Sequence, residues 1–328
     1  MKAMIITEPG GPEVLQLREV PDPTCGPDDI VVKVHATALN RADLLQRRGG
    51  YPAPAGVPQD IPGLEMAGTI VETGDNVELW APGDPVFALM PGGAYAEFVS
   101  LPASMALLMP PNLDFHQAAS IPEVFITAYD ALFNRLQLSS GESVLIHAVG
   151  SGVGTAAVQL AHVVGALTLG TAGSDDKLQR ASVIGLDRGI NYTKDDFAAA
   201  VSEFTQNKGV NCILDVIGAN YFEKNIRSLS EQGRLIIVGT MTGSKIEFDL
   251  GKLMGKRLQI GGTVLRARTL AEKVSLTSQI ADDVVPLLEA GVIIPSVDSV
   301  WPLTEAGQAH TYMESNQNFG KIVLAVDF

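Results

Sequence analysis

The fold of this chain is decided by the stretch Val144-Leu145-Ile146-His147-Ala148-Val149-Gly150-Ser151-Gly152-Val153-Gly154-Thr155-Ala156-Ala157. The stretch opens with an apolar run typical of a buried strand, passes through a glycine-rich turn and ends in residues that favour a helix. Glycines let a backbone bend sharply and approach a pyrophosphate closely, and the helix that follows presents free N–H groups and the positive end of its dipole. We therefore expect a dinucleotide to be bound here, by Ser151, Gly152, Val153 and Gly154.

The rest of the central segment alternates between strand and helix patterns. Apolar runs at 166–171, 211–216, 233–239 and 258–265 are separated by segments with helical periodicity. Such alternation predicts a parallel, doubly wound sheet of the Rossmann type. We assign residues 123–266 to this domain.

The flanking segments predict a second, β-rich domain. The run 31–36 alternates like a half-buried strand, and Gly and Pro clusters punctuate the first third of the chain. A long helix is expected over 270–290, and a strand at 320–324 is expected to return to the first domain. The chain is thus predicted to be an α/β protein in which residues 1–122 and 267–328 form a β-rich domain beside the doubly wound one.

Composition limits the partners. The formal net charge is −14, whereas a nucleic-acid partner requires a basic face. The two cysteines, Cys25 and Cys212, are too few for a disulfide framework or a cysteine-rich zinc site. No apolar run is long enough to span a bilayer, and the N-terminal apolar segment is too short for a signal peptide. We expect a cytoplasmic protein with neither nucleic acid nor membrane as partner.

The tip of the second strand of the doubly wound domain distinguishes NAD from NADP. An NAD site carries an acid there, roughly 20 residues after the glycine loop, to bind the ribose hydroxyls. Here the strand ends without one, and a hydroxyl and a cation that suit a 2′-phosphate follow. The Asp175-Asp176 pair must then point away from the phosphate. The residues expected to form this NADPH pocket are Gly173, Ser174, Lys177 and Tyr192.

Together these elements resemble the medium-chain dehydrogenase/reductase superfamily, in which a β-rich GroES-like catalytic domain accompanies a Rossmann domain. Zinc alcohol dehydrogenases of that superfamily carry a Gly-His-Glu segment whose histidine binds the catalytic metal. The matching stretch here is Gly63-Leu64-Glu65, and the upstream zinc cysteine is matched by Asn40. Leucine cannot bind zinc, and an amide is a poor substitute for a thiolate. We expect no metal.

Within the zinc-independent branch the chain resembles the quinone oxidoreductases. The motifs that carry the resemblance are 38–44 followed by Tyr51, the loop 147–154, the strand tip 171–174 with Lys177 and Tyr192, and the tail at 313–314 and 320–324. They are most similar to the p53-inducible NADPH quinone oxidoreductase type. Each motif alone is unspecific, whereas their combination is specific.

The resemblance implies further site residues. Asn40 and Tyr51 would line a substrate cleft between the domains, with Tyr51 as the candidate proton donor or hydrogen-bond partner of the substrate oxygen. Thr127 would face the nicotinamide and Lys321 would reach the pyrophosphate. The remaining cofactor contacts implied are Gly239, Met241, Gly262 and Val264.

These observations predict hydride transfer from NADPH to a quinone or a similar conjugated carbonyl, without a metal, because the nicotinamide carries the chemistry. Two alternatives stay open: an NADPH-dependent 2-enoyl or enone reductase, and a non-catalytic NADPH-binding protein. A homodimer that pairs through the strand at 258–265 is the family expectation. We expect His147 to pack within its strand, and Arg47, Arg48 and Arg266 to be solvated. A substrate role stays open for Arg266, because it lies near the expected nicotinamide end.

Overall fold

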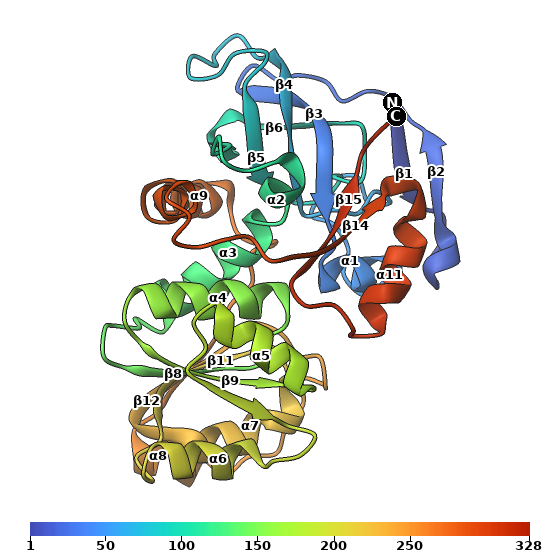
Figure 1. Cartoon of the computed structure of the whole chain (residues 1–328). Coiled ribbons are helices and arrows are strands. Elements are labelled where there is room, and N and C mark those ends of the chain that lie inside the picture. Colours follow the sequence, from blue (N-terminus) through green and yellow to red (C-terminus); the bar gives the residue numbers. More distant parts are fainter. The chain divides into compact units, whose positions relative to one another are not determined.

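The computed structural model describes all 328 residues, which divide into two compact units. The first unit comprises Met1–Ile126 and Arg266–Phe328, and the second unit comprises Thr127–Leu265. In Figure 1 the first unit includes both ends of the colour scale, and the second runs from green to orange. The second unit is therefore one continuous insertion into the first. None of the helices combines the length and the apolar character that a membrane span requires.

The second unit is built on a six-stranded parallel sheet in the order β10-β9-β8-β11-β12-β13. The strand order reverses beside β8, the strand that leads into the glycine-rich turn. Ligands of doubly wound sheets bind at the carboxyl ends of the strands at such a reversal. The strands are β8 (Ser143–Ile146), β9 (Leu167–Ala172), β10 (Arg188–Asn191), β11 (Val210–Asp215), β12 (Leu229–Ile237) and β13 (Gln259–Gly262).

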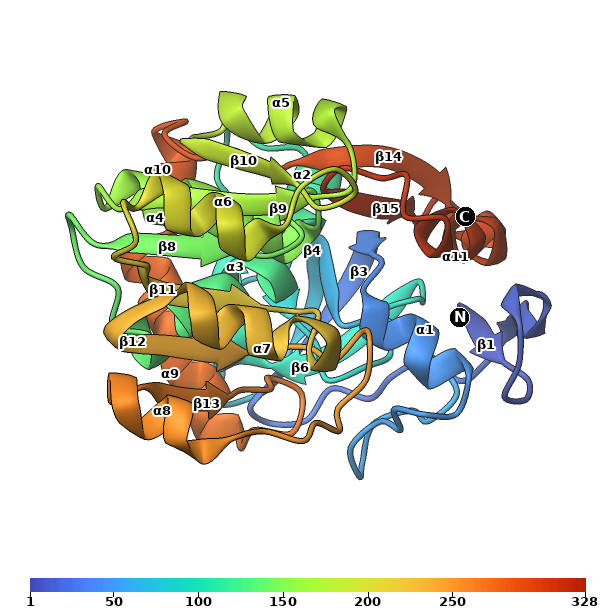
Figure 2. The ribbon, with the colours of Figure 1, turned by 90° about the horizontal axis from the view of Figure 1, so that it is seen from below.

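Helices cover both faces of this sheet, which confirms the predicted Rossmann-type fold. Figure 1 shows α4 and α5 on one face and α6, α7 and α8 on the other, and Figure 2 shows α6 and α7 in front of the strands. Beneath α6 and α7 lies an apolar core that includes Leu145, Ile213 and Leu235. The helices are α4 (Gly152–Val163), α5 (Asp175–Val183), α6 (Phe197–Phe204), α7 (Ala219–Ser228) and α8 (Leu250–Lys256).

The first unit is built on a mainly antiparallel sheet in the order β14-β15-β3-β4-β5-β7, with β6 paired to β3 beside this path. The last strand lies against β3, with Val323 opposite Ala38, so the predicted return of the tail to the first unit is confirmed. A separate hairpin is formed by β1 and β2. The strands are β1 (Lys2–Ile6), β2 (Leu15–Glu19), β3 (Asp29–Ala38), β4 (Glu65–Thr73), β5 (Pro85–Leu89), β6 (Phe98–Pro102), β7 (Ala106–Leu108), β14 (Val297–Pro302) and β15 (Lys321–Ala325).

The expectation of one long helix over 270–290 is wrong. The structure has two helices, because Pro286 lacks an N–H group and disfavours helical geometry in the residue before it. The first ends at Asp283, and Val284 separates it from the second. The helices that include residues of the first unit are α1 (Arg41–Arg47), α2 (Phe115–Ala119), α3 (Pro122–Tyr129), α9 (Leu270–Asp283), α10 (Val285–Glu289) and α11 (Ala306–Glu314). Single helical turns are η1 (Pro12–Val14), η2 (Ala103–Met105) and η4 (Leu303–Glu305), and η3 (Asp130–Arg135) is a π-helical turn of the second unit.

Candidate functional site

The glycine-rich turn joins β8 to α4 through a strained backbone. Ala148 adopts a left-handed conformation with φ of 55°, which is uncommon for a residue with a Cβ. The N–H of Ser151 donates to the carbonyl of Ala148 at 2.8 Å and closes the turn. Residues held in such conformations cluster at ligand sites, where the surrounding structure enforces them.

Gly154 cannot be replaced by a larger residue without moving the helix. A Cβ at this position would lie 2.2 Å from the carbonyl oxygen of Ala148 and 2.7 Å from the Cα of Val149. These contacts are to backbone atoms, which cannot turn aside as a side chain can. Gly154 therefore lets the first turn of α4 pack directly against the turn that leads into it, as a dinucleotide-binding helix requires.

The N-terminus of α4 retains donors for an anion. Ser151 caps the helix, and its Oγ accepts the N–H of Gly154 at 3.0 Å. The carbonyl of Ser151 accepts the N–H of Thr155 at 2.8 Å. Within the second unit the N–H groups of Gly152 and Val153 make no hydrogen bond. The turn thus presents two backbone donors at the positive end of a helix, which suits a pyrophosphate.

The strand tip after β9 brings the expected NADPH residues together. Ser174 caps α5, and its Oγ accepts the N–H of Lys177 at 3.3 Å. The ring of Tyr192 lies over Gly173 so closely that a Cβ there would come within 2.6 Å of the phenol oxygen. A hydroxyl, a helix N-terminus, a lysine and a half-exposed tyrosine therefore share one end of α5.

The negative charge of Asp175 would repel a phosphate bound near Ser174, but the Asp175 carboxylate has partners of its own. Its carboxylate accepts hydrogen bonds from Asn191 at 2.7 Å and from Lys194 at 2.5 Å. The bonds to Asn191 and Lys194 hold the pKa of Asp175 below its ordinary value. The charge beside Ser174 is thus balanced by Lys194, and Asp176 is exposed to solvent.

The other expected cofactor residues follow the ends of neighbouring parallel strands or lie on α3. Gly239 and Met241 follow β12, and Met241 donates weakly from its N–H to the carbonyl of Val216. Gly262 ends β13 opposite Ile237, and Val264 follows it. Because all strands are parallel, these segments meet at the edge of the sheet where the glycine-rich turn lies. Thr127 lies on α3.

His147 directly follows β8 and is buried, so the structure confirms that it packs in the interior and corrects its position to one residue beyond the strand. Its Nδ1 is 3.0 Å from the Oγ1 of Thr171, and its Nε2 is 2.7 Å from the Oδ1 of Asn225. Burial lowers the pKa of the imidazole from 6.5 to about 4, partly opposed by the bond to Asn225. The ring also packs edge-on against Phe197 and Tyr221.

In the first unit, the side chain of Lys321 is buried in an ion pair and does not lie on the surface. Its ammonium donates to Glu65 Oε1 at 2.6 Å, to Asn40 Oδ1 at 2.7 Å and to the carbonyl of Leu39 at 2.6 Å. An ammonium has three donors, and all three are used. We therefore correct the assignment of Lys321 to the pyrophosphate: its side chain is 3% exposed and is engaged with Asn40 and Glu65.

Glu65 links several elements of the first unit. Oε1 also accepts the amide N–H of Asn40 at 2.8 Å, and Oε2 accepts the backbone N–H of Glu123 at 2.8 Å at the start of α3. We call Asn40, Asp43, Glu65, Glu123 and Lys321 the charged cluster. Asn40 caps the N-terminus of α1, and the other members lie on α1, β4, α3 and β15. The two ionic partners, Glu65 and Lys321, are almost inaccessible to water.

Asp43 holds the loop that precedes β4 against the start of α1. One carboxylate oxygen accepts the N–H of Gly63 at 3.1 Å, and the other accepts the N–H of Asn40 at 2.8 Å. Burial raises the pKa of Asp43 to about 6, although these backbone bonds oppose the shift. Asp43 thus fixes both segments where a zinc alcohol dehydrogenase would carry its ligands.

The charged cluster does not fit a catalytic metal. Leu64 is buried and has no donor atom, and the amide of Asn40 is bonded to Glu65 and Lys321. The ammonium of Lys321 would repel a metal cation placed beside Asn40 and Glu65. No group of three or more histidine, cysteine or acidic side chains in the chain is arranged to hold a metal ion.

Arg266 is buried, so the expectation that it is solvated is wrong. Its Nε donates to the carbonyl of Pro91 at 2.7 Å, and its Nη1 donates to the carbonyl of Tyr51 at 3.1 Å. Its Nη2 donates to Gln46 Oε1 at 2.8 Å. The guanidinium also lies 5.1 Å from the centre of the Tyr51 ring, within the range of a cation–π contact. Arg266 thus fixes the segment that carries Tyr51.

Arg47 is likewise buried, whereas Arg48 is half exposed as expected. Arg47 pairs with Glu314 at 2.5 Å and lies 3.2 Å from the Nδ1 of His310. The Nε2 of His310 is 3.2 Å from the hydroxyl of Tyr95. These contacts attach α1 to α11. The sequence offered no signal for them, because the partners lie more than two hundred residues apart.

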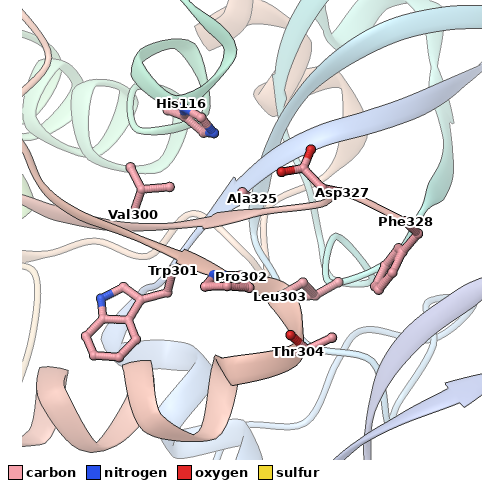
Figure 3. A pocket seen from close by; sticks show the side chains of 9 residues that line it. All are labelled: His116, Val300, Trp301, Pro302, Leu303, Thr304, Ala325, Asp327 and Phe328. Atoms are coloured by element: carbon pink, nitrogen blue, oxygen red, sulfur yellow. The ribbon is translucent and has the colours of Figure 1, made fainter.

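A surface pocket in the first unit has no connection with these residues. It encloses about 280 Å³ between β14, the turn after it and the C-terminus. Figure 3 shows Trp301 and Phe328 at its two sides and Asp327 above the apolar floor. None of the expected site residues lines it, so it plays no part in the function we derive.

Comparisons with known proteins agree with this geometry. Residues 26–111 match the alcohol dehydrogenase GroES-like domain, and residues 152–279 match the zinc-binding dehydrogenase domain. The quinone oxidoreductase of Rattus norvegicus is 32% identical over 99% of this chain and 97% of its own length. The Escherichia coli quinone oxidoreductase complexed with NADPH is 29% identical, with a TM-score of 0.89 over 99% of this chain and 100% of that one. An NAD-dependent alcohol dehydrogenase is 33% identical, with a TM-score of 0.90 and full coverage of both chains.

Proposed function

The chain belongs to the quinone oxidoreductase family of the medium-chain dehydrogenase/reductases, and we propose that it transfers a hydride from NADPH to a quinone or a similar conjugated carbonyl. That it is an NAD(P)-dependent oxidoreductase follows from the family and the fold. The observation that carries the finer proposal is the charged cluster, in which Lys321, Glu65 and Asn40 bond to one another where a metal site would otherwise lie. A quinone accepts a hydride without a Lewis acid because its product gains aromaticity.

The proposed preference for NADPH over NADH rests on Ser174, Lys177 and Tyr192. NADPH supplies the hydride, and the protein supplies position and the exclusion of water. The glycine-rich turn offers the N–H groups of Gly152 and Val153 to the pyrophosphate. Ser174 and Lys177, at the start of α5, offer a hydroxyl and a cation to the 2′-phosphate.

The cofactor preference is tested with Lys177→Ala. We expect the Kd for NADPH, measured by fluorescence titration, to rise at least tenfold, because a charged contact to the phosphate is lost. The Kd for NADH, which has no 2′-phosphate, is expected to change less than twofold. Equal weakening of both cofactors would contradict a phosphate role, and Lys208→Ala is a control at an exposed lysine of the same unit.

The class of acceptor is tested by comparing the rates at which different substrates are reduced. We expect the wild type to oxidise NADPH with 1,2- or 1,4-quinones faster than with an enoyl thioester. Tyr51→Phe is expected to lower kcat/KM for the quinone, since it removes the hydroxyl proposed to bind the substrate oxygen. Faster turnover of the enoyl thioester would identify an enoyl reductase. Tight NADPH binding with no turnover of any acceptor would indicate the non-catalytic role.

We further propose that the protein acts in the cytoplasm as a homodimer. Strand β13 lies at the edge of the parallel sheet, and the adjoining α8 exposes Leu250 and Met254. Pairing of two such edges would cover the unpaired backbone groups and these apolar side chains. Light scattering during size-exclusion chromatography should give twice the mass of the chain, and a monomer at micromolar concentration would contradict this arrangement.

A further inference from the structure

Glu123 is an ionisable side chain to which the proposed reaction has so far given no task. Its backbone N–H donates to Glu65, but its own carboxyl is not part of that bond. The side chain is partly exposed and lies at the start of α3. The charged and titratable groups that influence it belong to six other segments of the first unit. They are Glu65 on β4, Asp43 on α1, Lys321 on β15, Lys273 on α9, Tyr51 and Arg266.

Glu123 lies on the same helix, α3, as one of the residues expected to contact the cofactor. Glu123 and Thr127 are four residues apart on one helix, so their side chains lie on the same face about 6 Å apart along the axis. Thr127 is the residue proposed to face the nicotinamide. The charge of Glu123 also influences Tyr51, the residue proposed to bind the substrate oxygen. Glu123 therefore shares a face of α3 with the residue proposed to face the nicotinamide, and it belongs to the same unit as Tyr51.

We propose that Glu123 is the acid that donates a proton to the acceptor after the hydride has been transferred. The inference rests on the proposed function. The hydride carries two electrons to the quinone and leaves NADP⁺ and a quinol monoanion. The O–H bond of the Glu123 carboxyl then breaks, an O–H bond forms on the quinol, and solvent reprotonates the carboxylate. For an enone the same proton reaches the enolate.

The other titratable groups of the site suit this task less well. Asp43 and Glu65 are inaccessible to water, and their oxygens accept backbone and side-chain hydrogen bonds. Burial raises the pKa of Tyr51 above the ordinary value of 10, so it is a weak acid near neutral pH. Burial and the charge of Glu65 raise the pKa of Glu123 to about 8, although Lys321 and Arg266 oppose the shift. A carboxyl in that range is protonated at neutral pH and can still release its proton.

The test compares the wild type with Glu123→Gln. The amide keeps the size of the side chain and leaves the backbone bond to Glu65 in place, but it cannot donate a proton as an acid. We expect kcat with the quinone at pH 7 to fall about 100-fold, as for loss of a general acid. The Kd for NADPH is expected to change less than twofold. Glu72→Gln, at an exposed position on the same strand as Glu65, is the matched control with unchanged kcat.

The pH profile separates proton donation from a structural role. In the wild type kcat should decrease as the pH rises through about 8, because the acid loses its proton. In Glu123→Gln this decrease should be absent, and the solvent deuterium isotope effect on kcat should change. A merely structural role would lower activity without altering the profile.

Protonation of Glu123 is also tested without turnover. A raised carboxyl pKa means that the folded state holds its proton more tightly than the unfolded state, so stability is lost as the pH rises. The Tm of Glu123→Gln relative to the wild type should therefore increase between pH 5 and pH 9. A variant that keeps wild-type kcat and pH profile overturns the role of Glu123 but leaves the proposed function standing. A wild type that reduces neither quinones nor enones overturns both.

Discussion

The two parts of the proposed site are built in different ways. The glycine-rich turn of the second unit works through its backbone: a strained Ala148, a glycine that allows close packing, and two N–H groups at the start of α4. The charged cluster of the first unit works through side chains that come from four elements. The first depends on a few consecutive residues, and the second on the whole fold of its unit. They should therefore fail in different ways when mutated.

Lys321→Met is expected to have the largest effect on the charged cluster. It leaves Glu65 buried without its ionic partner, which costs about 3–5 kcal/mol of unfolding free energy. The double variant Lys321→Met with Glu65→Gln should recover most of the loss, because no uncompensated charge remains. Denaturant unfolding measures both variants. A loss below about 1 kcal/mol for the single variant would contradict the pairing described here.

Gly154→Ala is the corresponding change in the turn. The added Cβ must displace the start of α4 from the carbonyl of Ala148, and a displacement of about 1 Å can weaken a positioned interaction about 100-fold. We therefore expect the Kd for NADPH, measured by calorimetry, to rise about 100-fold. Gly255→Ala, on α8, is the control, since a Cβ there meets no atom within 4 Å. An unchanged Kd in Gly154→Ala would show that the close packing is unnecessary.

Mild acid should loosen the second unit through His147. In the unfolded chain His147 binds a proton below pH 6.5, whereas in the folded protein it does so only near pH 4. Its contribution to the free energy of unfolding is therefore fully present above pH 6.5 and is lost as the pH falls toward 4. This contribution amounts to about 2 kcal/mol between pH 7 and pH 5. The stability advantage of the wild type over His147→Gln, from urea unfolding at each pH, should narrow by this amount. An advantage that stays constant between pH 7 and pH 5 would contradict this role of His147.

Arg266→Lys should have the smallest effect on activity of these changes. It distinguishes the positioning of the Tyr51 segment by Arg266 from the positive charge of the side chain. Lysine keeps the cation but lacks the planar, forked guanidinium whose separate nitrogens reach Pro91, Tyr51 and Gln46 in their present positions. We expect kcat/KM for the quinone to fall about tenfold while the Kd for NADPH is unchanged. Arg268→Lys, two residues further on, is the control. Weaker NADPH binding in Arg266→Lys would contradict a role confined to the Tyr51 segment.

The same contrast explains what the sequence could reveal. The turn, the caps of Ser151 and Ser174 and the βα alternation are local patterns, so the fold and the cofactor loop could be predicted from consecutive residues. The sequence predicts that Ser151 contacts the dinucleotide, and the structure adds that its Oγ accepts the N–H of Gly154. Capping is itself a local interaction with a recognisable sequence pattern.

The charged cluster could not be predicted in this way. From the sequence, a lysine or arginine is predicted to be exposed to solvent unless its partner is known. The partners of Arg47 and Lys321 lie in segments far away along the chain. The sequence predicts that Arg266 is solvated for the same reason. Its three acceptors belong to loops whose shape follows only from the completed fold. The resemblance placed Asn40 and Tyr51 in the site but gave no indication of Glu123.

The return of β15 to β3 has a consequence for the order in which the chain folds during synthesis. The second unit is continuous and complete once Leu265 has left the ribosome, whereas the first unit lacks β15, which carries Lys321 and pairs with β3, until residues 321–325 emerge. Domains fold as units when their residues are available. We therefore expect ribosome-bound chains that end near residue 300 to resist protease across 127–265 and to be cleaved within 1–126. Protection of the N-terminal segment at that length would contradict this order.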